Sequence, residues 1–300
     1  MIDEVLGLVA DEHWFDRSRP FEVSINLTQG ACLWLLLTRR GVSDTYVKFS
    51  DCFDLRQEAA RAAAASTRYP GLAPAFIGHA SRGTLQVLVC RAVPYRRLSP
   101  AQLFHPRQGQ RALADLLGYF DAMQRPQAVQ VPGLSAAAEP AELLQALQAY
   151  FAGQPSAALA RRWLRNDALS RLASVVPHAQ HGDLVLNNIG VTPTGATVVF
   201  DWEDLSASWL TGLDLFTLEL SLAGSAERLF AARLQPQSPI SGLVARACEA
   251  MRLRRDDYET LTPLYALVFR YLKRNYGPGV RERMDLLLRD LDQQRNRALD

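Results

Sequence analysis

The sequence has few cysteines and keeps them apart. The four cysteines stand singly, at Cys32, Cys52, Cys90 and Cys248, so the close pairs of a zinc site or a disulfide framework are absent. This spacing favours small core residues in a protein from a reducing compartment.

Long apolar runs and an excess of one charge are also missing. No stretch approaches the roughly 18 apolar residues that cross a bilayer, and the opening MIDEVLGLVADEHW has acids where a secretory signal has a basic region. The 33 Lys and Arg residues are matched by 31 Asp and Glu, a formal net charge of +2. We therefore expect a cytoplasmic protein, with no electrostatic reason for a nucleic-acid or membrane partner. No internal repeat is present, and the oligomeric state is left open.

Short β-prone runs dominate the first hundred residues of a 300-residue chain that is 48% hydrophobic. These runs cover residues 21–27, 31–38, 45–49 and 83–93, and turn formers separate the first three. Residues 54–66 (DLRQEAARAAAAS) favour a helix, with Asp54 as the expected N-cap and Gln57 three residues later. The first three runs predict an antiparallel meander, and the helix and the strand over 83–93 follow it.

From about residue 100, apolar residues recur at helical spacing instead. The expected helices cover residues 112–123, 141–152, 158–176, 214–230 and from 243 nearly to the end, with a loop over 128–140. The sequence therefore predicts an α+β chain of two lobes with a hinge near residues 90–98. A small β-rich N-terminal lobe takes residues 1–93, and a larger, mainly helical C-terminal lobe takes residues 94–300.

A hairpin is predicted within residues 181–202, HGDLVLNNIGVTPTGATVVFDW, and it carries three polar side chains among apolar neighbours. Folding the hairpin brings Asp183, Asn188 and Asp201 towards one end. Asn188 and Asp201 offer the hard oxygen ligands that Mg²⁺ prefers, and Asp183 is then left to accept a proton from a hydroxyl group.

Two other interpretations of the hairpin remain open at this point. Its acids could simply be solvated at loop ends. Alternatively, His178, His181 and Asp183 form an H-x-x-H-x-D pattern for a metal, although the sequence offers no clear third and fourth ligand set.

The motif HGDLVLNNI followed by FDWED resembles the aminoglycoside phosphotransferase and choline kinase group, which has the protein-kinase-like two-lobe fold. The resemblance implies that Asp183 is the catalytic base, Asn188 a metal ligand and Asp201 the principal metal ligand. It further implies that His181 braces the loop and that Asp214, in GLDL, is a buried residue that caps the loop from below.

The N-terminal half carries residues that agree with this resemblance. Lys48 lies inside the apolar run TYVKF, and Glu58 follows ten residues later in RQEAA. In kinase-like sites a lysine of this kind grips the α and β phosphates of ATP, and a helix glutamate holds the lysine. The alternatives are a solvent-facing lysine on an edge strand and an ordinary surface glutamate.

The phosphate loop departs from the family pattern, because residues 26–32 (NLTQGAC) contain only Gly30. One glycine still permits a tight turn that points backbone N–H groups at phosphate oxygens, and Thr28 and Gln29 are placed to supplement it. The linker expected to pair with the adenine edge runs from Cys90 to Val93, and a plain strand end is the alternative there.

The predicted function is transfer of the γ-phosphoryl group of ATP, with Mg²⁺, to a hydroxyl group of an aminoglycoside, choline-like or sugar-like molecule. An inactive nucleotide-sensing or scaffold protein of the same fold is the alternative. A protein kinase is disfavoured, since residues 201–214 leave no room for an activation segment.

The sequence does not choose between ATP and GTP, nor between acceptors. Carboxylates that suit an amine-bearing acceptor lie in the C-terminal half, at Glu203, Asp204, Asp256, Asp257 and Glu259. Cations that suit an anionic acceptor lie there too, at Arg252, Arg254, Arg255, Arg270, Lys273 and Arg274. All of them are also compatible with solvated helix faces.

Overall fold

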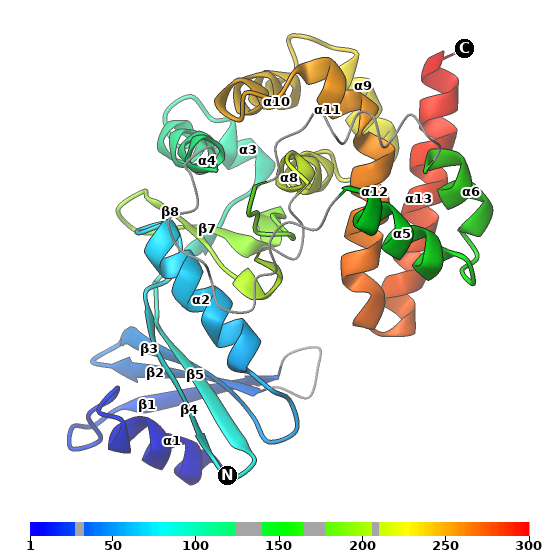
Figure 1. The fold of residues 1–300 in the computed structure, drawn as a ribbon. Coiled ribbons are helices and arrows are strands. Elements are labelled where there is room, and N and C mark those ends of the chain that lie inside the picture. Colours follow the sequence, from blue (N-terminus) through cyan, green and yellow to red (C-terminus); the bar gives the residue numbers. More distant parts are fainter. Residues whose placement is uncertain (28–32, 124–139, 165–177, 206–209, 300) are drawn as a thin grey trace. The chain divides into compact units, whose positions relative to one another are not determined.

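The computed structural model describes residues 1–27, 33–123, 140–164, 178–205 and 210–299, which fall into two compact units (Figure 1). The first unit comprises Met1–Leu98 together with Ile189–Glu203. The second comprises the described parts of Ser99–Ala128, Leu134–Asn188 and Asp204–Asp300. The stretch after the HGD motif is therefore divided between the units at Asn188.

An antiparallel sheet with strand order β1-β2-β3-β5-β4 lies in the first unit. Strands β1 to β3 form the predicted meander, whereas β5 pairs with β3 and β4, which is not predicted as a strand, lies at the edge. Its strands are β1 (Glu22–Leu27), β2 (Leu33–Arg39), β3 (Val42–Ser50), β4 (Phe76–Arg82) and β5 (Leu85–Arg91). Successive side chains point to opposite faces. Val47 and Phe49 of β3 pack in a core with helix α1 (Ile2–Asp11), whereas Tyr46 packs against residues of helix α2 (Arg56–Arg68). By this alternation, Lys48 points to the α2 face.

The helix α1 and the start of helix α2 both differ from the sequence predictions. No element is predicted over residues 2–11, although Val5, Leu8 and Val9 of α1 recur at helical spacing and are buried. The predicted N-cap Asp54 is wrong, because α2 is capped by Leu55 without a side-chain hydrogen bond. The Asp54 carboxylate instead accepts from the backbone N–H of Arg56 at 3.0 Å and binds the guanidinium of the same residue.

A second, three-stranded sheet in the first unit contains the predicted hairpin. Its order is β6 (Arg96–Arg97), β7 (Ile189–Val191) and β8 (Thr197–Val199), all antiparallel. Before β7 the chain forms a 3-10 turn, η1 (Leu186–Asn188), and after β8 another, η2 (Trp202–Asp204). The hairpin prediction is confirmed, with its first strand beginning at Ile189.

Helices build the second unit (Figure 1). They are α3 (Pro100–Leu103), α4 (Gln110–Ala122), α5 (Pro140–Phe151), α6 (Ala157–Trp163), α8 (Leu213–Ala223), α9 (Ala226–Arg233), α10 (Pro239–Ala250), α11 (Arg255–Thr260), α12 (Thr262–Leu272) and α13 (Pro278–Leu299), with the 3-10 turn η3 (Lys273–Asn275). Helices α8 and α12 are buried along almost their whole length, which fits their apolar sequences. Of the helices in the described ranges, none combines the length and the hydropathy needed to span a membrane.

Glycine and serine divide a segment that the apolar pattern predicts as one helix over residues 214–230. Gly224 ends α8 in the left-handed region, at φ 76°, and the Ser225 hydroxyl caps α9 by accepting from the N–H of Arg228. The predicted helix from residue 243 onward is likewise four helices, α10 to α13. Residues 165–176 and most of the loop over 128–140 lie outside the described residues.

Candidate active site

In the first unit, an ammonium group and two carboxylates meet on the α2 face of the sheet. Lys48 Nζ lies 2.7 Å from both Oε1 and Oε2 of Glu58 and 3.5 Å from Oε2 of Glu203. Strand β3 is not an edge strand, because it pairs with both β2 and β5. The side chains of Lys48 and Glu58 are only 12% and 22% exposed, so neither is an ordinary surface residue.

The charges around Lys48 keep it protonated. Burial acts to lower the pKa of its ammonium group, but Glu58 first, and then Glu203 and Asp201, act in the opposite sense and raise it above the ordinary value. Burial raises the pKa of Glu58, against the attraction of Lys48. Lys48 is therefore a cation at neutral pH, held in place before any ligand binds.

Asp201 follows β8 and is exposed, with a left-handed backbone at φ 63°. A non-glycine residue in this region is uncommon and must be held there by its neighbours. The next residue supplies such an anchor, since the buried indole of Trp202 stacks on Tyr69 at 5.2 Å and donates to the carbonyl of Val199 at 2.7 Å. Arg61 of α2 also donates to the carbonyl of Glu203. The turn after β8 is thus fixed at the two residues that follow Asp201.

In the second unit, Asp214 supports the loop that carries the HGD motif. Its fully buried carboxylate accepts from the backbone N–H groups of His181 at 2.7 Å and Gly182 at 2.8 Å, and from the hydroxyl of Tyr119. Burial raises the pKa of this carboxyl, while His181 and these hydrogen bonds oppose the rise. The expected position of Asp214 beneath the loop is confirmed.

The loop itself orients Asp183 and Asn188. The carbonyl of Asp183 accepts from Asn188 Nδ2 and from the backbone N–H of Val185, both at 2.9 Å. The carbonyl of Leu184 accepts from Thr217 of α8 at 3.1 Å. Because Nδ2 of Asn188 is used inside the loop, its Oδ1 atom is the one that suits a cation.

Lys273, which the sequence offers only as a possible contact of an anionic acceptor, pairs with Asp183. Lys273 Nζ lies 2.8 Å from Oδ2 of Asp183, 3.4 Å from Oδ2 of Asp204 and 3.5 Å from the hydroxyl of Tyr276. Burial acts to lower the pKa of the Lys273 ammonium group. Asp183 first, and then Asp204 and Tyr276, act in the opposite sense and raise this pKa above its ordinary value. Ninety residues separate Lys273 from Asp183, so no local motif links them; the only signal is a lysine that follows the apolar helix sequence YALVFRYL.

The remaining predicted site residues are less informative. Cys90 is the buried penultimate residue of β5, where burial raises the pKa of its thiol to about 12, and Val93 follows the strand in irregular backbone. Thr28 and Gly30 lie outside the described residues. The alternative metal cluster at His178, His181 and Asp183 has no support, because the described ranges contain no group of three His, Cys, Asp or Glu side chains that could share a metal ion.

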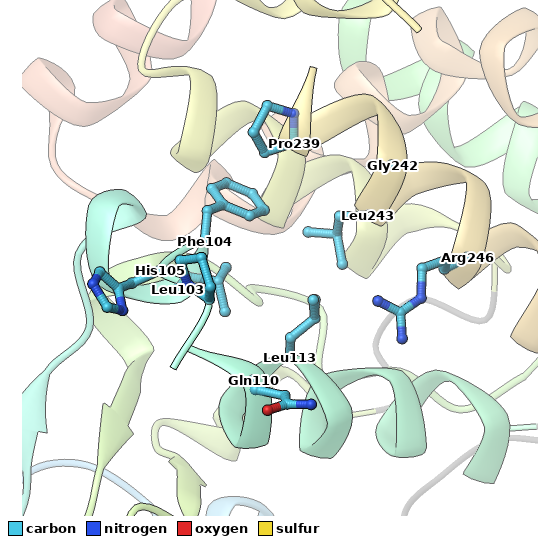
Figure 2. Close-up of a pocket in the computed structure, with 10 residues that line it drawn as sticks. Leu103, Phe104, His105, Gln110, Leu113, Pro239, Gly242, Leu243 and Arg246 are labelled. Atoms are coloured by element: carbon cyan, nitrogen blue, oxygen red, sulfur yellow. The ribbon is translucent and has the colours of Figure 1, made fainter. Parts of the chain in front are cut away.

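None of these residues lines a cavity of about 360 Å³ in the second unit, whose lining residues Figure 2 shows. Leu103 at the end of α3, Phe104 directly after it and Leu113 of α4 line the cavity, opposite Leu243 and Arg246 of α10. Its walls are mainly apolar and carry no carboxylate. The cavity therefore lacks the groups that phosphoryl transfer requires.

The family model described as "Phosphotransferase enzyme family" matches residues 33–212, more than half of the chain. No curated protein matches. Among solved structures, the chain is similar to the ADP-bound aminoglycoside phosphotransferase APH(2'')-Ib, with a TM-score of 0.61, 11% identity, and 95% and 96% of the two chains covered.

Two further structures are similar. For the aminoglycoside phosphotransferase APH(3'')-Id from Streptomyces rimosus, in complex with ADP and streptomycin, the TM-score is 0.55 at 16% identity, covering 90% of this chain and 98% of the other. For a choline/ethanolamine kinase family protein from Mesorhizobium loti, the TM-score is 0.55 at 17% identity, covering 95% and 94%. At these identities the likeness shows a shared fold, which is the expected kinase-like α+β fold.

Proposed function

Because the chain belongs to the phosphotransferase enzyme family, we propose that it transfers the γ-phosphoryl group of ATP to a hydroxyl group of a small molecule. The observation that carries this proposal is the ion pair of Lys48 and Glu58 on the central strand β3, with Nζ 2.7 Å from both carboxylate oxygens. Similar folds hold ADP, and one holds streptomycin as well. An inactive sensor or scaffold has no support in these comparisons.

Lys48 binds the phosphates in this proposal. Its ammonium group is nearly buried, its pKa is raised, and Glu58 fixes its direction. A cation that is already oriented loses little freedom when it meets phosphate oxygens, so it can stabilise charge that develops during transfer.

Asn188 and Asp201 would hold Mg²⁺. The donor chemistry fits, since Asp201 presents an exposed carboxylate after β8 and Asn188 keeps Oδ1 as its acceptor atom. When bound, Mg²⁺ neutralises negative charge on the phosphate oxygens. Thr28 and Gly30 for the phosphates, and the backbone of Cys90 and Val93 for adenine, remain part of the proposal on the strength of the sequence.

Asp183 acts as the base. Within the described residues, the Lys273 ammonium group donates to Oδ2 of Asp183. The other carboxylate oxygen, Oδ1, is then the one that receives the proton of the substrate hydroxyl. The acceptor hydroxyl gives its proton to Oδ1 as its oxygen bonds to the γ-phosphorus, and the bond from that phosphorus to the bridging oxygen breaks, releasing ADP. Asp214, through the backbone of His181 and Gly182, keeps the loop in place for this step.

Thermal unfolding with Mg²⁺ and ATP, followed by an acceptor screen, tests the proposal. We expect Mg-ATP to raise the Tm of the wild-type chain and of Asp183→Asn alike, and to raise the Tm of Lys48→Met much less. Turnover should fall by about 10² to 10⁴ in Asp183→Asn. Full turnover in Asp183→Asn, or no effect of Mg-ATP on the wild-type Tm, would contradict the assignment.

A further inference from the structure

The buried ammonium group of Lys273 occupies the position beside Asp183 that would attract a cationic ligand. Two carboxylates, Asp183 and Asp204, converge on Nζ at 2.8 and 3.4 Å, and the Lys273 side chain is only 7% exposed. Two carboxylates this close to one point are a strong site for a single positive charge. The chain fills that site with its own lysine.

Lys273 has little freedom to leave this position. It begins the turn η3 directly after α12, a helix in which almost every residue is buried. The Nζ atom lies 4.7 Å from the ring centre of Tyr276 and 3.5 Å from the hydroxyl of the same residue. These contacts and the two carboxylates hold the Lys273 ammonium group in place against an amine-bearing molecule.

The other carboxylates that suit an amine-bearing acceptor already have cationic partners in their own unit. Glu203 lies 3.5 Å from Lys48, and Glu259 lies 2.7 Å from Arg255. Asp256 and Asp257 each lie 3.8 Å from Arg254. Each of these acidic side chains therefore already lies within 4 Å of a cation of this chain, with Arg254 serving both Asp256 and Asp257.

We propose that Lys273 determines acceptor specificity by standing in for a substrate ammonium group between Asp183 and Asp204, so that the acceptor carries no ammonium group beside its reacting hydroxyl. This inference rests on the proposed phosphotransferase function for the identity of Asp183 as the base. A substrate ammonium group would meet the like charge of Lys273 at close range, whereas a neutral hydroxyl compound would not.

The first experiment asks whether the site binds an ammonium group, without using catalysis. Lys273→Ala removes three methylenes and the ammonium group, which together match n-propylammonium. We expect n-propylammonium chloride to raise the Tm of Lys273→Ala, and neither n-propanol nor sodium chloride to do so. The wild-type chain and the double variant Lys273→Ala, Asp204→Asn should respond little. Two results would overturn the proposal: an equal rise in Tm with n-propylammonium in all variants, or no rise in a folded Lys273→Ala.

The second experiment measures specificity with a pair of alcohols that differ in charge alone, choline and 3,3-dimethylbutan-1-ol. With Mg-ATP, we expect the wild-type chain to have a higher kcat/KM for the neutral alcohol than for choline. Where turnover is too slow to measure, we expect a lower Kd for the neutral alcohol. Lys273→Met should shift that ratio towards choline by about tenfold or more, and Lys273→Arg should restore it. Wild-type preference for choline, or an unchanged ratio in Lys273→Met, would overturn the proposal.

Arg270→Met is the matched control for a purely structural effect. Arg270 of α12 is another buried cation, 1% exposed and paired with Asp285 at 3.1 Å. Its loss should lower the Tm while leaving the choline to dimethylbutanol ratio unchanged. If the proposed function fails, Mg-ATP will not raise the wild-type Tm, whereas the n-propylammonium response of Lys273→Ala is independent of that result.

Discussion

The carboxylate of Asp214 accepts a 2.8 Å hydrogen bond from the backbone N–H of Gly182, so a buried charge in α8 fixes the main chain of the HGD loop. Two consecutive N–H groups and the Tyr119 hydroxyl depend on this one carboxylate. The position of the loop is therefore set by hydrogen bonds from its backbone to Asp214, and not by the side chains of the loop.

Removing the carboxylate should lower stability as well as activity. Asp214→Ala leaves buried donors without an acceptor, and we expect it to lower the free energy of unfolding by about 2 to 5 kcal/mol. Urea unfolding measures the change. The exposed Asp290 of α13 gives a control, because Asp290→Ala should change stability by less than about 0.5 kcal/mol. Similar losses in both variants would contradict the supporting role of Asp214.

Glycine at position 182 is required by both conformation and space. Its φ is 87°, and an added Cβ would lie 2.8 Å from the carbonyl oxygen of Asp204. Gly182→Ala should therefore cost about 1 to 3 kcal/mol of stability and reduce turnover.

Gly118 in α4 is the matched control for this substitution. A Cβ at Gly118 meets nothing within 4 Å, so Gly118→Ala should stabilise the chain by about 0.5 to 1 kcal/mol. Thermal unfolding of the two variants gives the comparison, and a stable Gly182→Ala would show that the loop can move away from Asp204.

The two carboxylates near Lys48 should contribute unequally. Glu58 meets Nζ with both oxygens at 2.7 Å, whereas Glu203 lies 3.5 Å away and is more exposed. We expect Glu58→Gln to reduce kcat/KM for ATP by roughly tenfold or more, and Glu203→Gln to reduce it less. Steady-state kinetics at varied ATP concentration decides this, and a larger effect at Glu203 would reverse the assignment.

Alkaline pH should lower the stability of the second unit, because Lys273 loses its positive charge there. Its pKa in the folded chain lies above the ordinary 10.5, so its contribution to stability is complete below that value and declines as the pH rises from there towards the folded pKa. The buried Tyr258 and Tyr265, whose pKa values are also raised, act in the same direction.

Comparison with Lys273→Met separates these contributions. The variant retains both tyrosines, so the free energy of unfolding measured by urea titration between about pH 9 and pH 11 should decline less steeply than in the wild-type chain. Identical slopes would mean that the ion pair with Asp183 and Asp204 does not contribute to stability.

The sequence predicted the parts of the fold and site that local chemistry constrains. Lys48 could be recognised because a charge inside TYVKF needs a buried partner, and the strand-turn-strand around residue 190 because its turn formers are local. Lys273 was missed as a contact of Asp183 because that contact spans 90 residues of chain. The break at Gly224 was missed because the apolar pattern continues across it.

The division of the chain at Asn188 and Glu203 means that the first unit is not encoded by one continuous stretch. An expression clone that stops at Leu98 would omit β7, β8, Asp201 and the Glu203 partner of Lys48. Exchanging the first unit between relatives therefore requires grafting two gene fragments, and a recombination point near residue 98 alone would separate Lys48 from part of its charged surroundings.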